Sequence, residues 1–172
     1  FIAMVVMTAQ PILTFPDEDS AIRHFYERPY KFEGVPIPDK GDLLWILCDV
    51  TQDGRDDIVI TGTNIRTGDW NWLGWDVYRG EMDGRFTKLM WGMTFDPDEV
   101  LVVKDEAGVR HLATVRPFSQ TEMIVTALEL ENDRSISSSA FRDLSTESSE
   151  DMAWLEEQRQ DANGMVRRIS AE

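Results

Sequence analysis

The sequence predicts a mainly β domain built from antiparallel strands, either a two-sheet sandwich or a small propeller-like stack, with a short helix near each end. Three observations support this fold class. Short apolar runs rich in branched and aromatic residues recur along the chain, turn residues such as Asp-Gly pairs separate them, and only two segments have a helical pattern. We expect about seven to nine strands from the number of these runs.

The composition indicates one domain with a strongly acidic surface. A chain of 172 residues that is 42% hydrophobic can bury about 70% of its unfolded surface in one core, and no long linker divides it. The 17 Lys and Arg against 32 Asp and Glu give a formal net charge of −15. This charge repels phosphate backbones and anionic lipid, so nucleic acid is not an expected partner.

The N-terminal residues 1–9, FIAMVVMTA, are apolar and uncharged and end at a small residue. This pattern is typical of the end of a secretory signal peptide, and it is too short to span a bilayer. An N-terminal β-strand is the alternative, because the basic start of a signal peptide is missing. We therefore expect residues 10–172 to form the domain, without a membrane span, in a secreted or periplasmic location.

A short helix is predicted over 15–30. Asp19 or Ser20 can cap its start, acidic residues lie near its positive end, and Pro29 closes it. The Pro and Gly residues that follow predict an extended connection over 30–41.

The most specific stretch is 49–58, DVTQDGRDDI, between two apolar runs that are expected to be buried strands. Its acidic residues recur at positions one, five and nine of a loop whose sixth residue is Gly54. This spacing lets a tight turn place oxygen ligands around a hard cation. An EF-hand is not expected, because position twelve is Ile60 rather than an acid. A plain Asp-Gly turn is the alternative, since Asp is also a common turn residue.

The loop and its flanking strands, residues 43–63, resemble the calcium loop of FG-GAP and VCBS repeats, which occur in integrin-type β-propellers and in many secreted bacterial proteins. The sequence departs from this family at Thr51, where Asn or Asp is usual, and at Gln52, where Gly is usual. No second copy of the motif is present, whereas a propeller has several blades. The resemblance implies weak binding of one calcium ion by the side chains of Asp49, Thr51, Asp53 and Asp57 and the carbonyl oxygen of Arg55.

Three tryptophans lie close together after this loop. Residues 62–74 predict a turn-rich segment that carries Trp70 and Trp72, and Trp75 follows at once. These indoles are a candidate platform for a sugar ring. The alternative is that Trp72 and Trp75 cap the core while Trp70 shields a loop, since large aromatic residues are frequent in cores.

Two hairpins are predicted next. The first has Asp83-Gly84 in its turn, a strong hairpin signal, and the second has its turn over 105–108. The segment 121–131 fits a strand better than a helix, because it starts with β-branched residues.

The last part of the chain is predicted to hold one helix. Ser and acidic residues predict a mobile connection over 135–149. A capped helix then begins at Ser148 and is ended by Asn163-Gly164, and 166–169 can add an edge strand.

Two functions of different class remain. The chain lacks the common motifs of nucleophilic, zinc and nucleotide chemistry. The first expectation is therefore a non-catalytic binding or interaction protein with one structural calcium loop and a protein or glycan partner. The alternative is a carbohydrate-active enzyme or sugar-binding module that uses the tryptophan platform and a pair of surface carboxylates.

Overall fold

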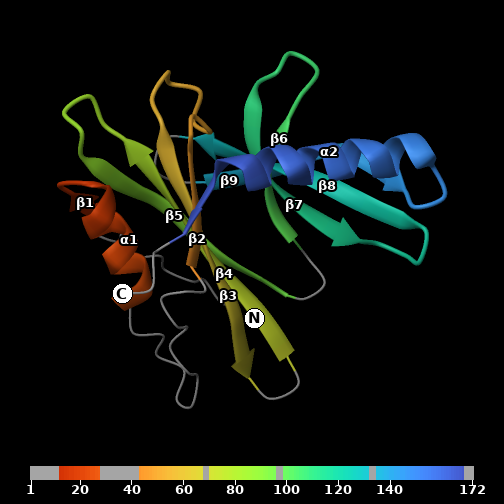
Figure 1. Cartoon of the computed structure of the whole chain (residues 1–172), viewed down its shortest axis with the longest axis horizontal. Helices are drawn as coiled ribbons and strands as arrows, with labels where there is room; N and C mark the ends of the chain where they lie inside the picture. Colours follow the sequence, from red (N-terminus) through yellow and green to blue (C-terminus); the bar gives the residue numbers. More distant parts are fainter. Residues whose placement is uncertain (1–11, 28–42, 68–69, 96–98, 132–134, 169–172) are drawn as a thin grey trace, which may run out of the picture.

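In the part of the chain that the structure describes, the protein is mainly β, with two antiparallel sheets that pack face to face and two helices (Figure 1). A computed structural model describes residues 12–27, 43–67, 70–95, 99–131 and 135–168. The predicted fold class is confirmed, in the form of a two-sheet sandwich. The predictions for residues 1–9 and 30–41 concern segments outside the described residues.

The first sheet contains a meander of four strands with one short strand at each edge. Neighbouring strands are antiparallel, and the order is β1-β5-β4-β3-β2-β10. The hairpin predicted around Asp83-Gly84 is β4 and β5, and the predicted C-terminal edge strand is β10. The bounds are β1 Thr14–Phe15, β2 Leu43–Cys48, β3 Asp57–Thr67, β4 Trp70–Gly80, β5 Phe86–Phe95 and β10 Val166–Arg168.

The second sheet is a meander of four consecutive antiparallel strands in the order β6-β7-β8-β9. The second predicted hairpin is confirmed as β6 and β7, and the predicted strand over 121–131 is confirmed as β8. The bounds are β6 Glu99–Lys104, β7 Arg110–Pro117, β8 Glu122–Glu131 and β9 Ser135–Ser145.

Strand alternation divides the core into three layers. On β3, Ile58 and Ile60 face helix α1, Glu18–Glu27, whereas Val59 faces the second sheet. Between the sheets, residues such as Val77 of β4 pack with Leu112 of β7. The outer face of the second sheet packs against Leu155 of helix α2. Each sheet therefore contributes core residues from both of its faces.

The two helices begin at side-chain caps. The Asp17 carboxylate accepts the Ser20 N–H (2.8 Å), so α1 is capped by Asp17 and the prediction of Asp19 or Ser20 is wrong. Helix α2, Ser149–Met165, begins at Ser148 as predicted, with the Ser148 hydroxyl accepting the Asp151 N–H. It continues through Asn163-Gly164 to Met165. Among the described residues, neither helix is long and apolar enough to cross a membrane.

Two predicted irregular segments are strands. The prediction of a turn-rich segment over 62–74 is wrong, because β3 continues to Thr67 and β4 begins at Trp70. The pairing of β3 with β4 has a bulge after Gly62, as is common where a glycine lies within a strand. The prediction of a mobile connection over 135–149 is also wrong, since residues 135–145 form β9 and pair with the whole length of β8. Cross-strand pairing outweighs the weak strand preference of a serine-rich segment.

Candidate functional site

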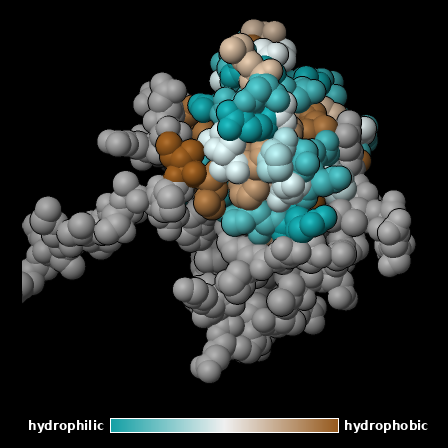
Figure 2. Space-filling view, turned by 90° about the vertical axis from the view of Figure 1, so that its left-hand side faces the viewer, coloured by the Kyte–Doolittle hydropathy of each residue, from teal (hydrophilic) through white to brown (hydrophobic). Residues whose placement is uncertain are grey.

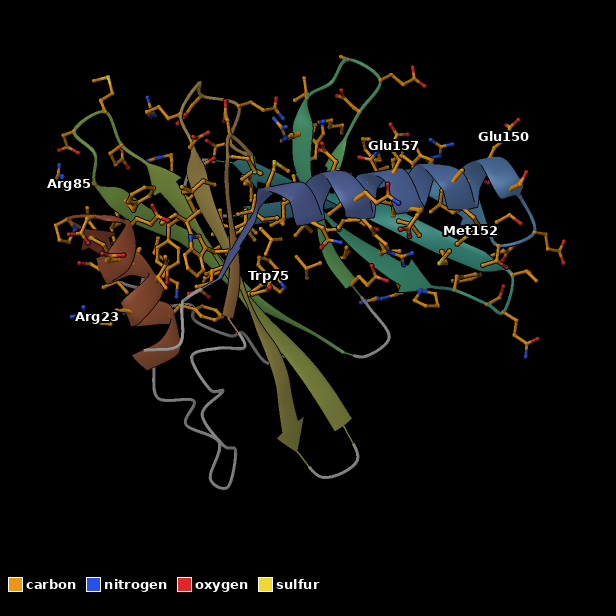
Figure 3. All side chains as sticks on the ribbon, in the orientation of Figure 1. Arg23, Trp75, Arg85, Glu150, Met152 and Glu157 are labelled. Carbon is orange, nitrogen blue, oxygen red and sulfur yellow. The ribbon has the colours of Figure 1, made fainter. Side chains whose placement is uncertain are left out.

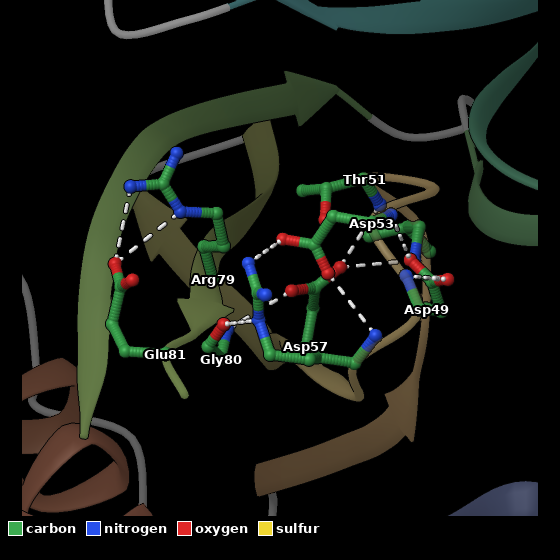
Figure 4. A network of polar contacts seen from close by, with 10 residues as sticks. Asp49, Thr51, Asp53, Asp57, Arg79, Gly80 and Glu81 are labelled. Atoms are coloured by element: carbon green, nitrogen blue, oxygen red, sulfur yellow. Dashed lines mark hydrogen bonds and ion pairs between the residues drawn. The ribbon is translucent and has the colours of Figure 1, made fainter. Parts of the chain in front are cut away.

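The Asp loop, residues 49–56, joins β2 to β3, as the sequence predicts. It projects from the same end of the sandwich as the turns over 81–85 and 105–109, at the top of Figure 1. The structure brings the predicted residues of the loop together, and Figure 4 shows how their side chains lie.

Asp49 folds the loop over its own backbone. One of its carboxylate oxygens accepts the Asp53 N–H (3.1 Å) and the other accepts the Gly54 N–H (2.8 Å). Gly54 has φ +84° and Gln52 has φ +61°, the left-handed region that favours glycine. Gln52 thus holds a conformation that suits the glycine usual there in the resembling family.

Asp57 anchors the loop to the sheet. Its carboxyl group is completely buried. One oxygen accepts the N–H groups of Val50 (3.0 Å) and Thr51 (2.9 Å), and the other accepts the Gly80 N–H from β4 (3.0 Å). Burial raises the pKa of Asp57, and these three backbone donors act in the opposite direction. One side chain therefore connects the loop to β4.

Gly80 is a site residue that the sequence analysis missed. A Cβ atom at this position would clash with the backbone carbonyl oxygen of Asp56, so only glycine lets the loop lie against the end of β4. The carbonyl oxygen of Gly80 also accepts the Arg55 Nε–H (2.7 Å). Gly80 thus donates its N–H to the Asp57 side chain at the start of β3 and accepts a hydrogen bond from the Arg55 side chain of the loop. A glycine at the end of a strand carried no signal that could have identified this contact.

Arg55 supplies positive charge inside the acidic loop. Its guanidinium forms an ion pair with the Asp53 carboxylate, whose other oxygen accepts the Arg55 backbone N–H (3.1 Å). A second ion pair, between Arg79 and Glu81 (3.1 Å), flanks the loop on β4. Every carboxylate oxygen of Asp49, Asp53 and Asp57 thus accepts a hydrogen bond from the protein.

The loop contains oxygen donors that suit a hard cation. Carboxylate and hydroxyl oxygens are the ligand type that calcium prefers. The Thr51 hydroxyl oxygen is buried at position three, where the resemblance places a ligand, and it interacts with the Asp57 carboxyl group. Within the residues that the structure describes, no group of three or more His, Cys, Asp or Glu side chains is arranged to hold a metal ion. The donor atoms are of the type that calcium binds, but they are not arranged around one point, so calcium binding stays a prediction that requires the carboxylates to rearrange.

The candidate tryptophan platform is not assembled at Trp75. This side chain is only 4% exposed and packs between the two sheets. Its indole lies over Gly92 of β5, where a Cβ atom would clash with the ring. Trp75 therefore has the core position of the alternative interpretation. The side chains of Trp70 and Trp72 lie outside the described residues, and their part in the prediction stays untested.

A second polar cluster lies in the core under α1. Asp76 is completely buried, and its carboxylate accepts hydrogen bonds from the Tyr78 hydroxyl (2.9 Å) and from Lys88 Nζ (2.6 Å). The Lys88 side chain is 11% exposed. Alternation along β4 predicts that Asp76 and Tyr78 share a face, but the sequence did not indicate that this face is covered by a helix.

Cys48 is a core residue. It is buried beside Val59 and Val77, and burial raises its pKa to about 12. A thiol with such a pKa is protonated at neutral pH and reacts slowly.

No family model, curated protein or solved structure matches this chain. The resemblance to FG-GAP and VCBS repeats therefore stays a prediction that rests on the loop residues.

Proposed function

We propose that this chain is a non-catalytic binding or interaction module. In this proposal the Asp loop is a calcium clip, that is, a loop whose fold is stabilised by one bound calcium ion, at the end of the sandwich where the turns over 81–85 and 105–109 lie. The observation that supports this most is the buried Asp57 carboxyl group, which ties the loop to β4 through Gly80. The acidic residues of the loop are used to hold backbone in place. Such hydrogen bonds give these residues a structural role at this end of the sandwich.

The charge of the loop supports a cation. Residues 49–57 contain four Asp and one Arg, and like charges at such short separation raise each other's free energy. Calcium, when bound, supplies positive charge that neutralises this repulsion. The side chains of Asp49, Asp53 and Asp57, the Thr51 hydroxyl and the Arg55 carbonyl would hold it. A secreted or periplasmic location, where calcium is abundant, belongs to the same proposal.

A thermal melt tests the clip. With calcium at about 1 mM and a dissociation constant of about 0.1 mM, mass action stabilises the native state by roughly 1.4 kcal/mol. This corresponds to a shift of roughly 3–6 °C for a chain of this length. Magnesium is expected to do much less, because it keeps its water shell.

The matched variants for this melt are Asp53→Ala in the loop and Asp83→Ala in the β4–β5 turn. Both remove an acid that precedes Gly-Arg. The shift should disappear in Asp53→Ala and persist in Asp83→Ala. Calcium stabilisation that is equal in the parent and in Asp53→Ala, or absent from both, would show that the loop is only a turn.

The partner that we propose is basic. Acidic residues are exposed on all three turns at this end, including Asp56, Asp83 and Glu106. Met82, 91% exposed in the β4–β5 turn, provides an apolar contact among them. Figure 2, which views the molecule from the side of α1, shows that hydrophilic residues make up most of the described surface there. Loops at one end of a β-sandwich are a common place for binding.

Two triple variants test this surface with poly-L-lysine as the basic probe. Asp56→Asn, Asp83→Asn and Glu106→Gln remove three charges from the turns. Glu150→Gln, Glu156→Gln and Glu157→Gln remove three from the exposed face of α2, where Figure 3 shows Glu150 and Glu157 pointing away from the sheets. The first set should weaken binding about tenfold at low salt and the second less than about threefold. Equal losses would mean that only the net charge of the chain attracts the probe.

A further inference from the structure

Arg55 already provides a positive charge for Asp53, one of the proposed calcium ligands. Both oxygens of Asp53 are committed to Arg55, one to its backbone N–H and one to its guanidinium. The same guanidinium is held on its other side, because Arg55 Nε donates to the Gly80 carbonyl oxygen (2.7 Å). Arg55 is the only basic residue between positions 49 and 57. The loop therefore contains its own counter-ion.

We propose that Arg55 is an internal cation that competes with calcium for the Asp53 carboxylate, so that the Arg55 side chain sets the calcium affinity of the loop. This inference rests on the calcium clip proposed above. An oxygen of Asp53 that pairs with the guanidinium has to leave it before it can bind a metal ion. A guanidinium that stayed close to the metal would also repel it.

The hydrogen bond to Gly80 makes this competition effective. A freely mobile arginine could swing into solvent at little cost, and an exposed ion pair contributes little to stability. Arg55 is only 34% exposed, and its Nε–H is held by a carbonyl group of β4. Displacing Arg55 from Asp53 therefore disturbs a second interaction.

The β4–β5 turn provides an internal control. It contains the same tripeptide, Asp83-Gly84-Arg85, with the same ion pair between Asp83 and Arg85 (2.6 Å). Arg85 is 56% exposed. Removing Arg85 changes the net charge of the protein by the same amount as removing Arg55, but Arg85 lies outside the loop that contains the proposed ligands.

The test is calorimetric titration of calcium chloride into the parent, Arg55→Ala, Arg55→Gln, Arg55→Lys and Arg85→Ala. Removal of one positive charge next to the cation should make the dissociation constant of Arg55→Ala about tenfold lower than that of the parent. Arg55→Gln, which keeps an N–H donor for Gly80 without the charge, should change in the same direction. Arg55→Lys and Arg85→Ala should stay within about twofold of the parent.

Each outcome decides the proposal. Tighter binding in both Arg55→Ala and Arg55→Gln, with Arg85→Ala unchanged, supports it. If the parent binds calcium and both neutral variants bind it equally or more weakly, the competition is refuted while the clip stands. If no variant binds calcium and no melting temperature changes, the clip itself fails and this inference falls with it. Arg55→Gln decides the matter if Arg55→Ala does not fold in chelator.

Discussion

The tripeptide Asp-Gly-Arg occurs twice at the same end of the sandwich, in the Asp loop at 53–55 and in the β4–β5 turn at 83–85. The local geometry of the two copies is nearly the same. The glycines have φ +84° and +82°, and each Asp side chain accepts the backbone N–H of its Arg, at 3.1 and 3.2 Å. The same three residues thus share a glycine conformation and an Asp-to-Arg hydrogen bond in both places.

The surroundings of the two turns differ. Arg55 and Asp53 are 34% and 25% exposed, and the loop that holds them is tied to Gly80 by Arg55 and by the buried Asp57. Arg85 and Asp83 are 56% and 53% exposed, at the tip of a hairpin. Local sequence therefore favours the conformation of the Asp-Gly-Arg segment, whereas contacts from distant residues determine whether that segment is held against the sheet.

We expect the largest difference in stability between the two regions when an Asp is replaced in each. Asp57→Ala leaves three backbone N–H groups without their acceptor, and each buried unpaired donor costs about 1–3 kcal/mol. We expect a loss of about 4 kcal/mol in the free energy of unfolding, measured by urea titration in chelator. Asp83→Ala, on the exposed turn, should be close to the parent. A comparable loss in both variants would mean that the docking of the loop does not stabilise the fold.

The glycines should differ next. Gly80→Ala places a Cβ atom against the Asp56 carbonyl oxygen, so the loop must move away and strain its hydrogen bonds to Gly80. A loss of about 3 kcal/mol is expected in the same urea titration. Gly84→Ala meets no atom within 4 Å and has only its positive φ to accommodate, which costs about 1 kcal/mol. A smaller loss for Gly80→Ala than for Gly84→Ala would contradict the close approach of the loop to β4.

The smallest difference is in the pH dependence of stability. Burial raises the pKa of Asp57, whereas the backbone N–H and guanidinium of Arg85 lower the pKa of Asp83. The raised pKa therefore gives Asp57 a stabilising contribution to the free energy of unfolding below its unfolded pKa, near 3.8. This contribution is lost as the pH rises through its folded pKa. That of Asp83 is present above 3.8 and is lost as the pH falls through its folded pKa.

The corresponding experiment is urea unfolding of the parent, Asp57→Asn and Asp83→Asn in chelator between about pH 3 and 7. The advantage of the parent over Asp57→Asn should shrink as the pH rises, and its advantage over Asp83→Asn should grow. Parallel curves for the two variants would contradict the different environments of the two carboxyl groups.

Much of the fold could be predicted from local signals. Asp83-Gly84 marked the β4–β5 hairpin, Ser148 marked the start of α2, and branched residues marked β2 and β3. The errors at 62–74 and 135–145 have one cause. Glycine and serine have weak strand preference, and pairing along a complete neighbouring strand overrides it.

The candidate site could be predicted only in part. Spacing identified Asp49, Asp53 and Asp57 as residues that act together. It did not show that Asp57 is buried or that it binds a backbone group 23 residues away, because such a contact depends on which strands pair. The role of Arg55 was missed for the same reason, since its partner Gly80 lies 25 residues further along the chain.

Amide hydrogen exchange at Gly80 and Gly84 tests the central claim most directly, namely that distant contacts hold the Asp loop against β4, whereas the β4–β5 turn is exposed at the tip of its hairpin. The Gly80 N–H donates to a buried carboxyl group, whereas the Gly84 N–H donates to the Glu81 carbonyl oxygen in an exposed turn (3.0 Å). After correction for intrinsic rates, Gly80 should exchange at least about 100-fold more slowly, near the rate set by global unfolding. In Asp57→Ala, which removes the acceptor, this protection should fall towards that of Gly84. Equal protection of the two glycines in the parent would contradict the account.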